Sequence, residues 1–115
     1  MSHAAKLLQT ATTHHQAGQL ADAEKAYRKL LRVEAAHIDG LRLLGGLYMQ
    51  TGQLDKAVEC LEKAARLHPQ NVETLTNLKK IIIIFDKLEI RYFRQSFDNI
   101  IKRNSISEFI KRAYE

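Results

Sequence analysis

Apolar residues recur three or four positions apart in successive stretches of about thirteen residues along most of the chain. This spacing is typical of amphipathic α-helices, whereas half-buried strands alternate apolar and polar residues. Short polar turns separate the stretches, and two of them contain the same triplet, first at Gly18-Gln19-Leu20 and again at Gly52-Gln53-Leu54. Glycine suits such a turn because it adopts the left-handed conformation that stops a helix. The pattern predicts an all-α fold made of antiparallel helical hairpins.

The sequence also repeats itself with a period of 34 residues, which separates the two Gly-Gln-Leu triplets. The same offset carries Leu7 onto Leu41 and Ala23 onto Ala57. Periods of roughly 20–50 residues are typical of solenoids, in which each unit covers the core face of its neighbour. We therefore divide the chain into a first repeat at residues 4–37, a second at 38–71, the first helix of a partial third at 72–86 and a tail at 87–115.

The second period resembles the tetratricopeptide repeat in the order and spacing of eight residues: Gly45, Tyr48, Gly52, Leu54, Ala57, Leu61, Ala64 and Pro69. The first period matches less fully, because Ala35 stands in the proline place and His14 in the tyrosine place. We expect His14 to fill the core of the first hairpin. The resemblance covers about residues 4–78, and it implies a short right-handed solenoid that binds another protein or a peptide.

In proteins of this family the first helices of successive repeats line a concave face, which receives an extended peptide or a partner helix. The resemblance places the following residues of this chain there: Leu8, Thr12, His15, Gln16, Asp39, Arg42, Gly46, Met49, Gln50, Glu73, Thr76 and Lys80. Leu8 and Met49 would be apolar anchors on a face that is otherwise of mixed polarity. The main functional prediction is a non-catalytic scaffold for a protein or peptide partner.

Candidate catalytic chemistry is scarce. His14 and His15 point about 100° apart on a helix, and no set of His, Cys and carboxylate residues has zinc-ligand spacing. Cys60 has no nearby glycine turn or paired histidine to activate its thiol, so we expect a half-buried structural residue. Gly45-Gly46 lacks the lysine and hydroxyl residue that follow the glycines of a phosphate loop. We expect no catalytic residue, no cofactor and no metal.

Composition changes this picture little. Hydrophobic residues make up 45% of the chain and charged residues 27%, which is typical of a folded globular protein. The single cysteine excludes an internal disulfide and fits a reducing compartment. The sequence has neither a secretion signal nor an apolar run of the roughly 20 residues that a membrane span needs. We therefore expect a cytoplasmic protein.

For the four isoleucines at positions 81–84, the preference of the residue type and the position in the repeat predict different secondary structures. β-branched residues favour strands, whereas the place of this run within the third period favours a helix. An uncovered run of this kind would be prone to aggregation, so we expect it to be buried within the chain or in a dimer.

The end of the chain departs from the repeat. Lys79, Asp86 and Arg91 replace three diagnostic small residues, and residues 79–115 hold nine Lys/Arg against five Asp/Glu. Helical spacing continues and predicts helices over about 88–103 and after Ser105. Three interpretations of this tail stay open: a cap over the last repeat, a basic segment that docks on an acidic partner or a membrane surface, and foreign sequence joined to a cut array.

Arginines and aromatic residues alternate at positions 91–94, which superficially resembles a nucleic-acid surface. Aromatic residues on a buried helix face with solvated arginines on the other explain this pattern better, so we expect no nucleic-acid partner.

Two alternatives to a free-standing scaffold remain. The Gly-Gln-Leu-rich repeats resemble those found ahead of bacterial glycosyltransferase and methyltransferase domains, so the chain could be the recognition fragment of a larger enzyme. It could also be a self-assembling structural module, because two and a fraction repeats leave end faces that a symmetric homodimer could cover, through an end face or through the tail.

Overall fold

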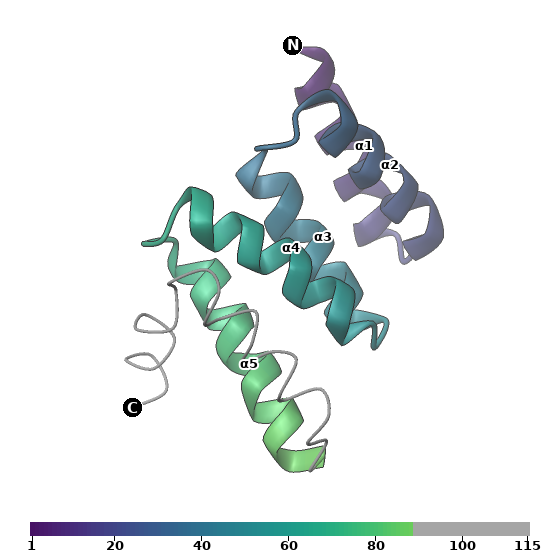
Figure 1. The fold of residues 1–115 in the computed structure, drawn as a ribbon. Coiled ribbons are helices and arrows are strands. Elements are labelled where there is room, and N and C mark those ends of the chain that lie inside the picture. Colours follow the sequence, from purple (N-terminus) through teal and green to yellow (C-terminus); the bar gives the residue numbers. More distant parts are fainter. Residues whose placement is uncertain (89–115) are drawn as a thin grey trace.

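The computed structural model describes residues 1–88 of the chain and folds them into five α-helices, with no strand in that range (Figure 1). The helices are α1 (His3–Gln16), α2 (Leu20–Val33), α3 (Ile38–Gln50), α4 (Leu54–Leu67) and α5 (Val72–Leu88). α1 packs against α2, and α3 packs against α4, as antiparallel hairpins. The second hairpin stacks on the first through α2 and α3, and α5 packs against α4 and α3. The prediction of an all-α array of helical hairpins is confirmed.

The helices predicted over about 88–103 and after Ser105, together with the predicted cap, lie outside the described residues. Within residues 1–88, none of the helices is long and apolar enough to cross a membrane.

A left-handed glycine ends the first helix of each complete hairpin, since Gly18 and Gly52 both have a φ of 78°. The Gly18 N–H donates to the His15 carbonyl at 3.1 Å, and the Gln19 N–H donates to the His14 carbonyl at 2.9 Å. Two equivalent hydrogen bonds close α3, so both turns are Schellman motifs. α5 continues through Asp86, 34 residues after Gly52. The Cβ of aspartate makes the left-handed conformation more costly than it is for glycine.

Small residues bring the two helices of each hairpin together. Ala11 and Ala23 in the first hairpin and Ala57 in the second are completely buried. At Gly45 of α3, an added Cβ would lie only 2.7 Å from Cγ of Leu61 in α4. Real Cβ atoms do not approach a neighbour so closely, which means that the contact between α3 and α4 requires glycine at this position.

The core continues from one hairpin into the next. Tyr27 and Leu30 of α2 are fully buried, and an added Cβ at Gly40 of α3 would lie 2.8 Å from Cδ2 of Leu30. The isoleucine run is helical, as its place in the repeat predicts. Ile81 is fully buried, whereas Ile83 remains 40% exposed.

The two adjacent glycines of α3 give the first testable prediction. Gly45→Ala should lower the free energy of unfolding by about 1–3 kcal/mol, because Leu61 must shift to admit the new methyl group. Gly46→Ala should raise it by about 0.5–1 kcal/mol, because outside the local helix backbone no atom of the described residues lies within 4 Å of the added Cβ, and alanine favours a helix. Urea unfolding of both variants measures the difference, and equal effects at the two positions would contradict the packing described here.

Candidate functional site

Side-chain contacts join the first helices of the three periods across one surface. Nε2 of His15 in α1 lies 2.9 Å from Oε1 of Gln50 in α3. Nε of Arg42 in α3 lies 3.0 Å from Oε2 of Glu73 in α5. These two contacts bring α1, α3 and α5 onto a common surface, which we call the first-helix face.

His15 is held from both sides of its ring. Its Nδ1 lies 3.1 Å from the hydroxyl of Tyr27, and the two rings meet edge to face at 84° with centroids 5.9 Å apart. If the Gln50 carboxamide oxygen accepts from Nε2, Nδ1 is left to accept from the Tyr27 hydroxyl. Tyr27 is completely buried, so the partly buried His15 links the core of the first hairpin to the first-helix face.

Arg42 lies at the centre of the charged part of this face. Its side chain is only 21% exposed and faces two more exposed carboxylates, Glu73 at 3.0 Å and Asp39 at 3.5 Å. Nε of Arg42 makes no aligned hydrogen bond within the described residues, so its contact with Glu73 is an ion pair rather than a directed bond. Ion pairs with exposed partners contribute only about 0–1 kcal/mol each to the stability of the fold.

The first-helix face also carries partly exposed apolar side chains and, on α3, a position without a side chain. Met49 is half-buried against the core, and Ile83, one period later at the same repeat position, is 40% exposed. Between Arg42 and Met49 along the helix lies Gly46, where an added Cβ would meet nothing within 4 Å. The backbone of α3 is therefore accessible at the middle of the face.

Five of the residues predicted for the concave face are thus joined by direct contacts, namely His15, Asp39, Arg42, Gln50 and Glu73. Leu8 and Met49 are half-buried and pack against the core. Thr12 is also half-buried, and its hydroxyl donates to a carbonyl of its own helix. The remaining predicted residues of α1 and α5 are exposed: Gln16, Thr76 and Lys80.

His14 does not occupy the position expected from the sequence. It is half-buried, and its Nδ1 lies 2.6 Å from Oε1 of Gln19 in the turn that follows α1. The histidine ring that contacts Tyr27 belongs instead to His15. In the second repeat the tyrosine place holds Tyr48, which is 6% exposed and belongs to the core. Histidine at position 14 hydrogen-bonds locally to the turn instead.

Tyr27 is the residue of this site that sequence reasoning missed. It lies twelve positions after His15 in the sequence. The same separation of twelve divides Ala11 from Ala23 across the first hairpin. That spacing is the signal that could have paired the two rings.

Burial raises the pKa of three side chains, which extends the pH range over which each stays neutral. Burial raises the pKa of the Tyr27 hydroxyl, an effect that the positive charge of Arg42 partly offsets. Burial and a hydrogen bond to Glu24 raise the pKa of Tyr48 to about 12. Burial raises the pKa of the Cys60 thiol to about 11, although Lys63 partly opposes it. A nucleophilic thiol needs a lowered pKa, so Cys60 has the character of a structural residue.

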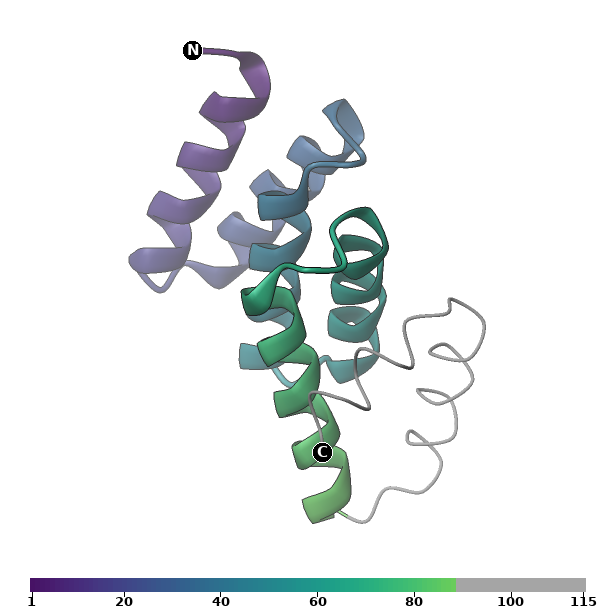
Figure 2. The same ribbon diagram turned by 90° about the vertical axis from the view of Figure 1, so that its left-hand side faces the viewer.

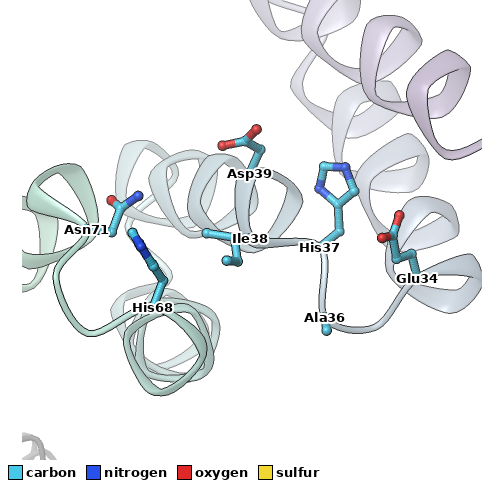
Figure 3. Close-up of a pocket in the computed structure, with 7 residues that line it drawn as sticks. All are labelled: Glu34, Ala36, His37, Ile38, Asp39, His68 and Asn71. Carbon is cyan, nitrogen blue, oxygen red and sulfur yellow. The ribbon is translucent and has the colours of Figure 1, made fainter.

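A shallow pocket of about 440 Å³ lies at the turns between hairpins (Figure 3). The side chains of Glu34 and His37 lie on one side of Ile38, and those of His68 and Asn71 lie on the other. Nδ1 of His37 and Oδ1 of Asn71 cap helices by accepting from the backbone N–H groups of Gly40 and Thr74. Within residues 1–88 no group of three or more His, Cys, Asp or Glu side chains could hold a metal ion.

Residues 14–81, more than half of the chain, match the sequence model of the tetratricopeptide repeat. The chain therefore belongs to the tetratricopeptide-repeat family, whose repeats are generally protein-interaction modules. A stretch of 69 residues, 60% of this chain, is 33% identical to the protein named Protein CTR9 homolog from Arabidopsis thaliana. The match spans only 6% of the length of that plant protein.

The raised pKa of Tyr48 gives a pH-dependent prediction. Its hydroxyl donates to Oε1 of Glu24 at 2.9 Å and thereby joins α3 to α2. The pKa of Tyr48 is higher in the folded protein than its ordinary value of 10.0. The protonated hydroxyl therefore stabilises the fold fully below pH 10, and this stabilisation is lost as the pH rises towards about 12. Tyr48→Phe should lower the free energy of unfolding by about 1 kcal/mol at pH 8, because it removes this hydrogen bond.

Between pH 10 and 12 the stability advantage of the wild type over Tyr48→Phe should fall by on the order of 1 kcal/mol in all, so that it is lost as the pH approaches about 12. Chemical unfolding of both proteins across this range isolates Tyr48 from the lysines and other tyrosines, which titrate in both. Parallel stability curves would show that the hydroxyl is not held as described.

Proposed function

We propose that this chain is a non-catalytic scaffold that binds an extended segment of a partner protein across the first-helix face. The general role of tetratricopeptide repeats in protein interaction supports the binding function. The raised pKa values of Tyr27, Tyr48 and Cys60 support structural rather than catalytic roles for these three groups.

Gly46 is the observation that carries the proposal. A glycine inside a helix costs about 1 kcal/mol relative to alanine. At Gly45 the close contact with Leu61 offsets that cost, but at Gly46 no side chain of residues 1–88 uses the open space. Close approach of a partner backbone is a physical reason to omit a side chain there. An extended chain is the partner that can approach the backbone of α3 so closely.

The surroundings of Gly46 indicate the character of the bound segment. One turn towards the start of α3, the charge of Arg42 is already balanced by two carboxylates, so that end suits polar groups better than a strong net charge. One turn towards the end of α3, Met49 offers a flexible apolar side chain, and Ile83 offers another on α5. We therefore propose a segment that places an apolar residue near Met49 and Ile83 and carries little net charge where it crosses Gly46.

A displayed library of random peptides selected on the wild-type chain tests this proposal without a known partner. Gly46→Gln should weaken binding of the selected peptides at least about tenfold, because its side chain fills the space above the backbone of α3. Arg42→Glu combined with Met49→Ala should also weaken the binding of these peptides. Fluorescence anisotropy of labelled peptides gives the dissociation constants, and circular dichroism checks that the helices are retained.

Ala21→Gln is the matched control, since it adds the same side chain at an exposed position of α2. It should leave the dissociation constants unchanged. Selected peptides that bind wild type, Gly46→Gln and the double variant equally well would show that the binding surface lies elsewhere on the chain.

A further inference from the structure

Four cations form a stripe along the solvent side of α2. Lys25, Arg28, Lys29 and Arg32 follow one another at helical spacing, so they lie on the same side of the helix. All four are exposed, on the side opposite the buried residues of α2. At the rise of an α-helix they extend over about 10 Å. We call these four residues the α2 basic stripe.

The stripe carries positive charge that the described residues do not neutralise. None of its four members forms an ion pair within residues 1–88. Glu24 lies four residues before Arg28, where an acid could pair with it. Oε1 of Glu24 accepts instead from the Tyr48 hydroxyl at 2.9 Å. The outer side of α2 therefore presents four unpaired cations to the solvent.

The equivalent helix of the second hairpin shows that the fold does not require this charge pattern. In α4, Glu59 and Glu62 stand 34 residues after Lys25 and Arg28, and the other two positions keep cations. Arg66 lies 3.5 Å from Glu62, so the outer side of α4 carries both signs of charge and an ion pair. In α2, like charges stand three and four residues apart, which destabilises a helix. Binding of an anionic partner is a physical reason to keep such a pattern.

We propose that the α2 basic stripe binds an acidic segment of a protein, whose carboxylates lie along α2 beside the four cations. The carboxylates would relieve the repulsion within the stripe, and each arginine can donate two parallel hydrogen bonds to one carboxylate. The stripe belongs to the first hairpin, at the opposite end of the described helices from α5 (Figure 1 and Figure 2). The first-helix face is formed by α1, α3 and α5, so this second surface does not depend on the proposed function.

Other anionic partners fit this surface less well. Single-stranded nucleic acids stack their bases on aromatic side chains, but Tyr27 of α2 is completely buried. Helices that lie on a membrane insert their apolar side chains, and those of α2 are turned into the core. A duplex presents a broad anionic surface, whereas α4 carries Glu59 and Glu62 at the positions that would widen the stripe. A narrow stripe of cations suits a narrow acidic chain.

A fluorescent peptide of alternating glutamate and serine tests the proposal, beside the same peptide with glutamine in place of glutamate. The wild type should bind the glutamate peptide and not the glutamine peptide. Lys25→Glu with Lys29→Glu should weaken that binding at least about tenfold, because it leaves the stripe with no net charge. Fluorescence anisotropy at low ionic strength gives the dissociation constants, since salt screens exposed charges. Both lysines are exposed and unpaired, so circular dichroism should show that the helices are retained.

Lys6→Glu with Lys63→Glu is the matched control. It makes the same two substitutions at exposed positions of α1 and α4 and changes the net charge equally. Its dissociation constant for the glutamate peptide should stay close to that of the wild type. Gly46→Gln should also leave this binding unchanged, because it alters the first-helix face alone.

The proposal is overturned if the wild type binds the two peptides equally, or if the two double variants weaken binding of the glutamate peptide to the same extent. The second result would assign the attraction to the net charge, most of which residues 79–115 supply. An oligothymidylate of equal charge, or vesicles that contain phosphatidylserine, gives a third outcome. Tighter binding of either one than of the glutamate peptide, lost in Lys25→Glu with Lys29→Glu, would overturn the acidic protein segment as the occupant.

Discussion

The contact between Gly45 and Leu61 sets the distance between the two helices of the second hairpin, and the arrangement of the other helices depends on it. With no Cβ at Gly45, α3 lies close enough to α4 for Leu61 to be completely buried. The first hairpin reaches a similar result with Ala11 and Ala23, both of which are also completely buried. Close packing of this kind leaves little freedom for the helices to shift, so the first helices present a fixed set of side chains.

That fixed spacing has a direct effect on the first-helix face. His15 reaches Gln50 across 35 residues of sequence because the first hairpin stacks on the second, and Arg42 reaches Glu73 because α5 packs against α3 and α4. The charge contacts themselves contribute little stability, since their carboxylates are largely exposed. Packing therefore positions the face, and the polar contacts orient the side chains on it.

Features governed by local backbone chemistry could be predicted from the sequence. The helix ends at Gly18 and Gly52 follow from the conformational freedom of glycine, and the period of 34 predicted which helices would lie side by side. Two features of the site could not be predicted in this way. The hydrogen bond of His14 to Gln19 and the contact of His15 with Tyr27 depend on which of two adjacent histidines turns inward, and the alternation of polar and apolar residues does not decide that. The repeat signature, by contrast, already separates Gly45 from Gly46, and the structure adds that Leu61 is the neighbour that requires glycine at position 45.

The exposed side of α1 that carries Thr10 and Thr13 and the first-helix face are both largely polar, yet they differ in how their polar groups are bonded. On α1 the threonine hydroxyls donate to carbonyls of the same helix, so they have no donor left for a partner. On the first-helix face Nε of Arg42 lacks an aligned hydrogen bond within the described residues, and the backbone beside Gly46 has no side chain above it. A hydroxyl that already donates within its own helix has no second donor to offer a partner. Nε of Arg42 is buried beside Glu73, so it is the space beside Gly46 that leaves the backbone of α3 open to contact. The bonding of their polar groups and the open backbone beside Gly46 therefore distinguish the two surfaces, rather than polarity alone.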